Sequence, residues 1–320
     1  MRHILSLKEI TKEDITSLLD IAKVLKEHRR KERPTILLPN KTLIMFFEKS
    51  STRTRLSFEA AMTELGGHAI FLDKKTTQFS LSDFQDEIRA VMRFGHALMY
   101  RAIAAESVET AASMNAIPVI DGCSEKYHPA QALSDLLTMA EAKGGIENVH
   151  KVVWLGIENN VSNTLALGCA KMGIKVVIVA PDADKGSIDP ELEEQLQQTN
   201  NIERTLDISK ALAAADFVHT DTWMNMEFFE NGSVIKDKKE EFEKRKELFL
   251  PYQLNAKLID TYCPDAHIMH CMPCHVDYEI TRDAVEHKNS LIFDQAENRL
   301  HMQKAMLVWL MNKEKEVYSL

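Results

Sequence analysis

The sequence predicts an α/β protein with two doubly wound parallel-sheet domains and an active site in the cleft between them. Short apolar runs alternate with amphipathic segments along the whole chain, which is typical of parallel strands covered by helices. The length of 320 residues suits two domains of about 150 residues each. Gly144-Gly145 separates two such alternating sets. We therefore expect one domain over residues 1–143, completed by a C-terminal helix at about 299–320, and a second domain over 150–298.

The expected elements follow from hydrophobic periodicity. A first helix over residues 11–30 has one apolar face and an N-cap candidate in Thr11. The segments expected to be strands are 43–47, 69–72, 97–100, 117–120, 152–155, 176–179, 217–218, 268–269 and 291–293. Residues 78–86 are polar and are expected to form an exposed loop. The charge-rich segment 228–248 is expected to be a solvated helix, with a flap that closes over a bound substrate as the alternative.

The junction after the strand at 43–47 is the first candidate site. The residues Ser51-Thr52-Arg53-Thr54-Arg55 stand where a buried strand is followed by an amphipathic helix. A helix N-terminus has free N–H groups and a partial positive charge, so it attracts anions. Hydroxyl donors and guanidinium groups add to that attraction. We interpret this segment as a phosphate or carboxylate site; a Ser/Thr helix cap with solvated arginines is the alternative.

Other polar residues also follow expected strands. In sheets of this kind, ligands bind beyond the carboxyl ends of the strands. In the first half, Arg101 and the segment His128-Pro129-Ala130-Gln131 stand at such positions. In the second half, the strand ends carry Asn159-Asn160, Asp221 and His270-Cys271. Asn160 and Asp221 offer acceptors suited to an ammonium group.

Composition and the remaining motifs exclude several classes of protein. The net charge of −9 argues against nucleic-acid binding as the main function. No apolar run reaches the ~20 residues that span a bilayer, and the N-terminus runs quickly into charged sequence, so we expect no signal peptide. The five cysteines indicate reduced thiols. Cys271-Met272-Pro273-Cys274 has the spacing of a redox pair or half a zinc site, which is the less favoured interpretation. The second half lacks the GxGxxG of dinucleotide-binding domains.

Taken in order, these motifs resemble the aspartate/ornithine carbamoyltransferase family, on its ornithine side, over nearly the whole chain. The matching segments are Ser51-Thr52-Arg53-Thr54-Arg55, His128-Pro129-x-Gln131, Asp221-x-Trp223-x-x-Met226, His270-Cys271-x-Pro273 and Asn298-Arg299. The resemblance implies that the carbamoyl group of carbamoyl phosphate moves to the amine of ornithine, giving citrulline and phosphate. It implies no metal and no cofactor. It also implies a cytoplasmic homotrimer in arginine metabolism, with small-molecule substrates and neither nucleic acid nor membrane as a partner.

The resemblance also assigns site residues. Those expected to contact carbamoyl phosphate are Ser51, Thr52, Arg53, Thr54, Gln78, Arg101, His128, Gln131, Cys271, Met272 and Arg299. Gln78 would reach into a neighbouring subunit's site. The amino-acid substrate would contact Asn160, Asp221, Asn225 and Met226. The residues expected to act in catalysis are Arg101, His128, Cys271 and Asp221: the first two would stabilise the developing oxyanion, and the last two would orient or deprotonate the amine.

The sequence departs from the ornithine enzymes at four places. It has Asn225-Met226-Glu227 for Ser-Met-Gly, Ser80-Leu81-Ser82-Asp83 for Gly-Arg-Gly-Glu, Met272 with Cys274-His275 around Pro273, and Gly156-Ile157-Glu158 for Gly-Asp-Gly. All four lie on the side expected to hold the second substrate or the neighbouring loop. Two alternatives therefore remain open: a carbamoyltransferase for another amine, such as an acylated ornithine or a polyamine, and a catalytically silent family member.

Overall fold

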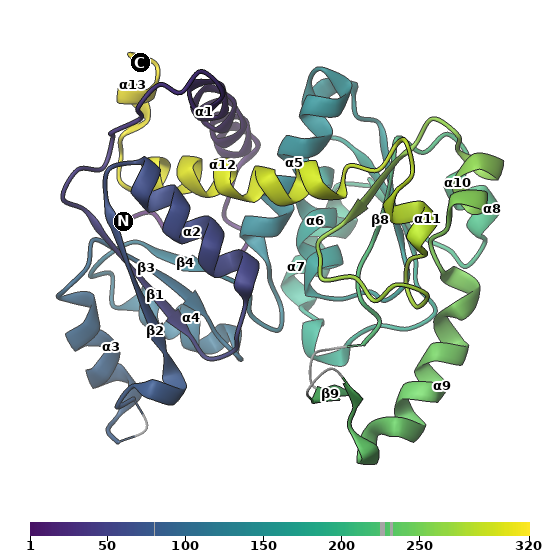
Figure 1. Ribbon diagram of the computed structural model, residues 1–320, viewed down its shortest axis with the longest axis horizontal. Helices are drawn as coiled ribbons and strands as arrows, with labels where there is room; N and C mark the ends of the chain where they lie inside the picture. Colours follow the sequence, from purple (N-terminus) through teal and green to yellow (C-terminus); the bar gives the residue numbers. More distant parts are fainter. Residues whose placement is uncertain (80, 225–227, 231–232) are drawn as a thin grey trace. The chain divides into compact units, whose positions relative to one another are not determined.

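The computed structural model describes residues 1–79, 81–224, 228–230 and 233–320. The chain divides into two compact units, each with its own parallel sheet and flanking helices (Figure 1). Unit 1 contains Met1–Leu137, Asn163–Gly168 and Glu297–Leu320, and unit 2 contains Thr138–Ser162 and Cys169–Ala296. The predicted α/β fold class with two parallel sheets is confirmed.

The sheet of unit 1 places polar strand ends side by side. Its order is β2-β1-β3-β4, with β2 at His68–Asp73, β1 at Thr42–Phe47, β3 at Ala97–Arg101 and β4 at Val119–Asp121. All pairs are parallel, and the register aligns Phe47 with Arg101 and Tyr100 with Asp121. The carboxyl ends of β1, β3 and β4 therefore meet at one edge of the sheet.

Helices cover both faces of this sheet (Figure 1). The helices with most or all of their length in unit 1 are α1 (Lys12–Arg30), α2 (Thr52–Glu64), α3 (Phe84–Met92), α4 (Ala105–Ser113), α5 (Pro129–Lys143), α12 (Ile292–Leu310) and α13 (Glu314–Val317). Alternation along the strands directs Ile44, Phe46 and Leu98 to one face, where they form an apolar core with residues of α3 and α4. Helix α1 begins as predicted, because Thr11 and Asp14 form a complete capping box.

The sheet of unit 2 has the order β11-β8-β5-β6-β7. Its strands are β11 (His267–His270), β8 (Phe217–Thr220), β5 (Lys151–Leu155), β6 (Lys175–Val179) and β7 (Ile202–Arg204). Its other elements are α7 (Pro190–Gln198), α8 (Ile208–Leu212), α9 (Lys239–Phe249), α10 (Ala256–Tyr262), α11 (Arg282–Val285) and the antiparallel pair of β9 (Phe229–Glu230) and β10 (Ser233–Val234). Helix α6 (Asn160–Lys171) is divided between the two units. Valines from β5, β6 and β8, with Leu155 of β5 and Ile268 of β11, contribute to its core. Because β11, β8 and β5 are neighbours, their carboxyl ends also converge.

The charge-rich segment 228–248 contains one α-helix, α9, which has a buried face. Within α9, Phe242 and Phe249 are buried against Trp223, whose ring stacks on Phe249 with 5.6 Å between the centroids. The charged side chains occupy the remaining surface of the helix. The expected helix is present only from Lys239 onward, because β9, β10 and a 3₁₀ turn (Lys236–Lys238) precede it. It is not fully solvated, since its packed aromatic residues attach it to unit 2.

Two local predictions were wrong. Residues 291–293 are not a strand: α12 begins at Ile292, and Leu291 donates a backbone hydrogen bond to Ile268. A run of three apolar residues is too short for its periodicity to distinguish a strand from a helix. The polar stretch 78–86 includes the start of α3, because the Asp83 side chain accepts a hydrogen bond from the backbone N–H of Gln85 and caps the helix.

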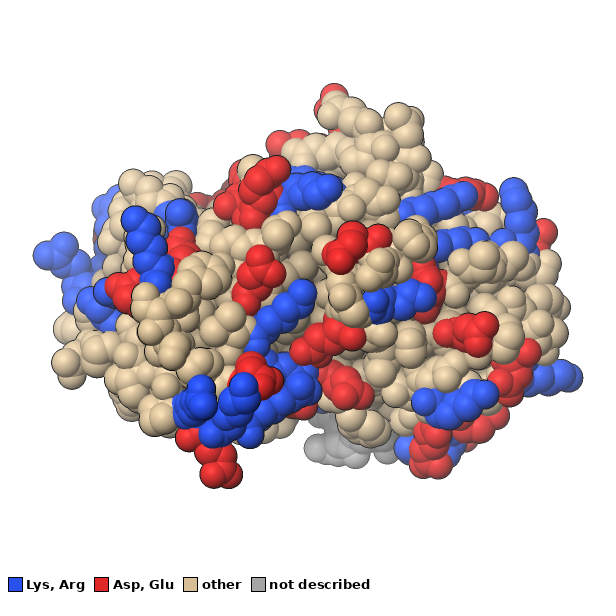
Figure 2. All heavy atoms as spheres, turned by 90° about the horizontal axis from the view of Figure 1, so that it is seen from above, with Lys and Arg blue, Asp and Glu red and all other residues tan. Residues whose placement is uncertain are grey.

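The surface has mixed charge. Figure 2 shows acidic and basic side chains interspersed over the face that it draws. This distribution agrees with the modest negative net charge of the sequence and differs from the continuous basic surface of nucleic-acid-binding proteins. Among the described residues, no helix has both the length and the apolar composition needed to cross a membrane.

Candidate active site

The segment that follows β1 forms the N-terminus of α2, as the sequence predicts. Ser51 is the N-cap residue, and its Oγ accepts a hydrogen bond from the backbone N–H of Thr54 at 3.4 Å. The first turn of α2 contains no acidic residue. The backbone N–H groups of this turn and the hydroxyls of Ser51 and Thr52 therefore create a local environment that favours an anion.

Thr54 is the point at which the cationic side chains converge. It is 0% exposed, and its Oγ1 accepts a hydrogen bond from Arg299 of α12 at 2.8 Å. The Ser51 hydroxyl donates to the same oxygen at 3.0 Å, and Arg101 approaches it at 3.4 Å. Residues from three distant parts of the sequence therefore meet at the α2 N-terminus.

A buried polar network holds α12 against α1 and α2, and thereby positions Arg299. Lys26 of α1 donates to the side chain of Asn298 at 2.7 Å. Lys304 of α12 donates to Glu64 of α2 at 2.9 Å, and Arg29 pairs with the same carboxylate. Both lysines are almost fully buried. Because breaking a buried charge pair is costly, these contacts fix the register of the helix that carries Arg299.

His128 lies among four cations. Burial lowers the pKa of His128 well below its usual value, and the charges of Arg299, Arg101, Lys49 and Arg53 lower this pKa further. His128 is 6% exposed, and because its pKa is lowered in this way, the imidazole is neutral at physiological pH. It can donate or accept a hydrogen bond without adding a charge. The charges of these cations acting on one buried imidazole give this part of unit 1 a positive environment that favours an anion.

Gln131 is oriented one turn further along α5. Its Nε2 donates to Asp135 at 2.8 Å, which leaves the amide oxygen as the free acceptor. Within the described part of the chain, this buried Oε1 has no hydrogen-bond partner. An unsatisfied buried acceptor of this kind is suited to an N–H group of a ligand.

The two arginines of the motif differ in environment. Arg53 is half-buried, and its charge acts on His128. Arg55 is exposed, pairs with Glu59 at 2.8 Å and lies over the ring of Phe71 at 3.8 Å. Lys49 also belongs to the cationic group, although we did not select it from the sequence. Its position directly before the serine pair was the available signal.

Gln78 and Thr52 stand apart from the buried cluster. Gln78 lies on the exposed segment between the 3₁₀ turn η1 (Lys74–Thr76) and α3. Thr52 is the first residue of α2 and is also exposed. Because both side chains are exposed, burial in unit 1 gives no support for their predicted contact with carbamoyl phosphate.

In unit 2, Asp221 is the centre of a second polar cluster. It follows β8 and is 7% exposed. One carboxylate oxygen accepts hydrogen bonds from the Cys271 thiol at 2.9 Å and from the Thr222 backbone N–H at 2.7 Å. The other accepts from Asn159 at 2.8 Å. Three neighbouring strand ends therefore supply a carboxylate, a thiol and an amide to one point.

From the sequence we selected Asn160, but the asparagine that donates to Asp221 is its neighbour, Asn159. Asn160 is the first residue of α6 and is half-buried, whereas Asn159 is the residue that contacts Asp221. Met272 follows Cys271 and packs partly against the unit 2 core. Asn225 and Met226, which we also expected to bind the amino acid, lie outside the described residues.

A buried imidazole–carboxylate pair supports Cys271. The Nδ1 of His270 accepts from the backbone N–H of Met272 at 2.9 Å, so its Nε2 carries the proton that faces Glu279 at 3.2 Å. The backbone N–H of His275 donates to the same carboxylate. Burial alone would raise the pKa of Glu279, but the hydrogen bonds from His270 and His275 outweigh burial and lower it to about 2. No motif or spacing in the sequence pointed to Glu279.

The pair predicts a pH-dependent contribution to stability. The pKa of Glu279 falls from 4.5 to about 2 on folding, which corresponds to about 3 kcal/mol at 1.36 kcal/mol per unit. Because the folded-state pKa is depressed, this stabilisation is present above about pH 4.5 and is lost as the pH falls toward 2. We expect Glu279→Gln to lower the free energy of unfolding by about this amount at neutral pH, and by less at acidic pH.

Urea unfolding of both proteins from about pH 7 to about pH 3 measures this effect. Glu286→Gln is the matched control, because Glu286 is exposed and makes only a 3.8 Å contact with Arg282. A difference between Glu279→Gln and the parent protein that stays constant with pH would contradict the assignment.

The same part of unit 2 contains a set of metal-ligand types. Asp221, His270 and Cys271 offer three ligand atoms within 4.8 Å of one another. Each residue already takes part in the hydrogen bonds described above: the thiol with Asp221, and the imidazole with Met272 and Glu279. These contacts make the group a hydrogen-bonded cluster that orients the thiol.

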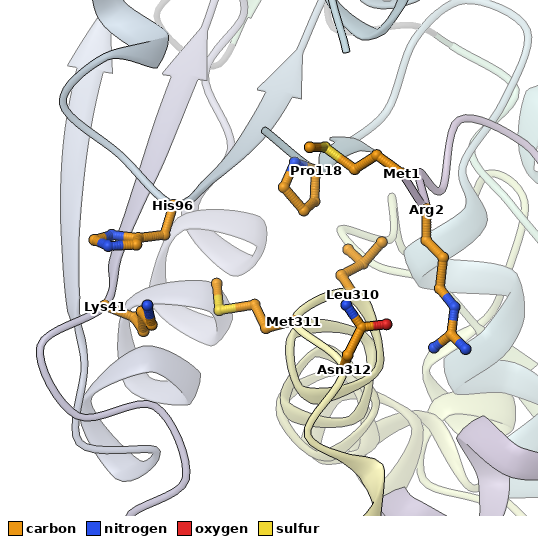
Figure 3. A pocket seen from close by; sticks show the side chains of 8 residues that line it. All are labelled: Met1, Arg2, Lys41, His96, Pro118, Leu310, Met311 and Asn312. Atoms are coloured by element: carbon orange, nitrogen blue, oxygen red, sulfur yellow. The ribbon is translucent and has the colours of Figure 1, made fainter. Parts of the chain in front are cut away.

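A separate pocket of about 520 Å³ lies in unit 1. In Figure 3, His96 and Lys41 lie on one side, Arg2 on the other, and Met311 between them. His96, Lys41 and Pro118 directly precede β3, β1 and β4. The pocket is therefore at the amino ends of the strands, opposite the edge that carries Arg101 and Thr54, and it contains none of the predicted site residues.

Fold and side chains together define a two-unit α/β protein with a cluster of cations around His128 in one unit and a carboxylate–thiol cluster in the other. Comparison with known protein families identifies this class. The model of the carbamoyl-P binding domain of the aspartate/ornithine carbamoyltransferases matches residues 2–141, and that of their Asp/Orn binding domain matches residues 148–310.

Individual relatives match over nearly their full length. An ornithine carbamoyltransferase from Methanospirillum hungatei is 40% identical over 97% of this chain and 99% of its own, and one from Bacillus subtilis is 39% identical over 98% and 94%. The solved ornithine carbamoyltransferase of Pyrococcus furiosus superposes with a TM-score of 0.86 at 38% identity, covering 96% of each chain. The chain belongs to the aspartate/ornithine carbamoyltransferase family, which confirms the predicted resemblance.

Proposed function

We propose that this protein transfers the carbamoyl group of carbamoyl phosphate to the amine of ornithine, giving citrulline and phosphate. One observation carries the proposal: Arg101 and Arg299 converge on Thr54 at a helix N-terminus, beside a neutral His128. Relatives that carry the ornithine carbamoyltransferase name match nearly all of the chain. Family membership confirms carbamoyl transfer as the class of reaction.

The phosphate group would bind at the start of α2. Ser51, Thr52 and the backbone N–H groups of the first turn donate to its oxygens, and Arg53 and Arg299 balance its two negative charges. As the C–O bond to phosphate breaks, charge builds on the leaving group. Fixed guanidinium groups stabilise that charge without reorganising.

The carbamoyl group would bind between Arg101, His128 and Gln131. When the amine attacks, the carbonyl oxygen gains negative charge, and Arg101, Thr54 and His128 are placed to donate to it. The unpartnered Oε1 of Gln131 would accept from the carbamoyl NH₂ group. This acceptor distinguishes a carbamoyl group from an acetyl group, which has no N–H.

The acceptor amine would bind to the cluster in unit 2. Asp221 attracts an ammonium group, and Cys271 with Asn159 holds the carboxylate in place. The attacking nitrogen must lose a proton to expose its lone pair. Asp221 and Cys271 would orient the amine and assist that loss. The new C–N bond then forms as phosphate leaves, so the atoms balance without any other reactant.

Measuring citrulline and phosphate formation tests the proposal. Carbamoyl phosphate would be combined in turn with L-ornithine, Nα-acetylornithine, putrescine and L-aspartate. We expect kcat/KM for ornithine to exceed the others by at least about a hundredfold. Turnover with another amine alone would refute ornithine as the acceptor, and no turnover with any amine would refute the enzyme assignment.

We propose further that the protein works as a cytoplasmic homotrimer in arginine metabolism. The supporting features are an edge strand, β2, and exposed apolar side chains near it: Leu56 is 60% exposed, and Ile36 and Ile70 are also exposed. The exposed Gln78 would then complete a neighbouring subunit's site. The free thiols, including the half-buried Cys271 and Cys274, suit a reducing compartment.

Assembly can be tested by complementation. The Gln78→Ala and Arg53→Ala variants would each be inactive alone, but a mixed trimer would contain some sites in which both residues are intact. We expect activity to return when the two inactive variants are unfolded together and refolded, and light scattering to give the mass of three chains. A monomeric mass, or no return of activity, would contradict shared sites.

A further inference from the structure

A buried carboxyl group lies beside the proposed anion site and has no role in the reaction described above. Asp121 is the last residue of β4 and is 1% exposed. In the sheet register it stands opposite Tyr100, so it is adjacent to Arg101 on the neighbouring strand. Its backbone N–H donates to the backbone carbonyl of Ile4 at 2.8 Å.

The carboxyl group holds the turn that follows β4. Its Oδ1 accepts from the backbone N–H of Cys123 at 2.8 Å. Cys123 has a φ of +147°, in a region that favours glycine, so the hydrogen bond stabilises an uncommon backbone conformation. The carbonyl of Gly122 in the same turn accepts from Arg101 at 3.3 Å. Asp121 therefore positions the Gly122 carbonyl, which accepts a hydrogen bond from Arg101, a residue proposed to bind carbamoyl phosphate.

The pKa of Asp121 lies near neutral pH. Burial raises its pKa to about 7; hydrogen bonds from Ser124 and Cys123, and the charges of Lys49 and Arg101, oppose the rise only in part. Lys49 faces it from the segment after β1, and Arg101 faces it from β3. His128, which follows the same turn, has a pKa well below its usual value and stays neutral in this range.

We propose that Asp121 takes up a proton when a doubly charged phosphate group binds beside Arg101. This inference rests on the proposed anion site of unit 1. The charges of Arg101 and Lys49 stabilise an ionised Asp121. A bound dianion would interact with the same cations and would itself repel the negative charge of Asp121. The neutral carboxylic acid is then the more stable form. It retains an acceptor for Cys123, so the turn persists.

The consequence is an affinity for dianions that depends on pH. Below about pH 7 the carboxyl group is already neutral, and binding requires no proton. Above about pH 7 the site must first take a proton from solvent, so affinity falls by up to tenfold per pH unit. Activity at limiting carbamoyl phosphate would decline in the same range.

Sulfate is the suitable probe, because it is doubly charged throughout this range, whereas phosphate itself titrates near neutrality. Calorimetry would measure sulfate binding from about pH 6 to about pH 9 in pairs of buffers with different ionisation enthalpies, which reports the protons taken up. Asp121→Asn keeps an oxygen that accepts from Cys123 but cannot titrate. Asp73→Asn is the matched control, since Asp73 ends β2 in the same sheet and its side chain caps a surface turn.

For the parent protein and Asp73→Asn, we expect sulfate affinity to fall about tenfold between about pH 6.5 and about pH 8.5, with proton uptake on binding. For Asp121→Asn, we expect affinity equal to that of the parent at low pH, no decline and no proton uptake. Equal slopes in all three proteins would overturn the inference and leave the anion site standing. The absence of proton uptake in the parent near pH 7.5 would also overturn it, whether or not the variant folds. No sulfate binding at any pH would overturn the anion site and the inference with it.

Discussion

Arg53→Ala is expected to reduce kcat/KM for carbamoyl transfer by at least about a thousandfold, whereas Arg55→Ala should change it by less than about threefold. The two side chains belong to the same helical turn but have different environments. Arg53 is half-buried, and its charge acts on His128. Arg55 is exposed, paired with Glu59 and stacked on Phe71. Only the first is placed to stabilise charge on a leaving phosphate.

Steady-state kinetics with saturating ornithine measures this difference, and circular dichroism establishes that both variants fold. Arg53→Lys provides a further control, because it keeps the charge but loses the planar fork that binds two oxygens at once. We expect it to recover only part of the activity. If Arg53→Ala keeps more than about a tenth of the parent activity, the phosphate site does not include Arg53, and the interpretation of the whole motif fails.

Asp221→Asn is expected to reduce kcat/KM for ornithine by a similar factor while leaving sulfate binding in unit 1 unchanged. The carboxylate accepts hydrogen bonds from Asn159, Cys271 and Thr222, which hold it in one position. Asparagine matches its size but lacks the charge that attracts an ammonium group. In a site with little solvent, an ion–ion interaction contributes much more than it does in bulk water.

The control for this variant is Asp182→Asn, because Asp182 is an exposed carboxylate after β6 in the same sheet. It should have no effect on turnover. A normal kcat/KM for ornithine in Asp221→Asn would refute the placement of the acceptor amine at this cluster. Loss of sulfate binding in the same variant would indicate a general structural failure, which the thermal unfolding curve would also reveal.

Several site features were predictable because they depend on local sequence. The continuous apolar run before Ser51 and the periodic apolar face after it place that serine at a helix start, and the structure has it as the N-cap of α2. Asp221 and Cys271 follow apolar runs that do form neighbouring strands. In a parallel sheet, such positions share an edge whatever the order of the strands.

Other features depend on contacts between residues far apart in the chain. The family resemblance placed Thr54 and Arg299 in one site, but the direct hydrogen bond between them, across 245 positions, is visible only in the structure. The same holds for the contact of Glu279 with His270, beside Cys271. Local sequence alone does not distinguish Arg53 from Arg55, because a helix turns by about 100° per residue and the neighbouring elements decide which side is buried; the family resemblance was what selected Arg53. From the sequence, Lys26 and Lys304 look like ordinary surface lysines. They are buried because α12 packs against α1 and α2.

The amino-acid sequence by itself determined the class of fold, the start of α2 and the set of strand ends that carry chemistry, because hydrophobic periodicity and helix capping act over a few residues. Only the tertiary structure decided which arginine faces His128, which asparagine holds Asp221, and that Asp121 is a buried acid beside Arg101. The physical reason is that burial and electrostatic coupling are set by groups brought together from distant parts of the chain. These two effects determine the charge state and orientation of every side chain proposed here to act.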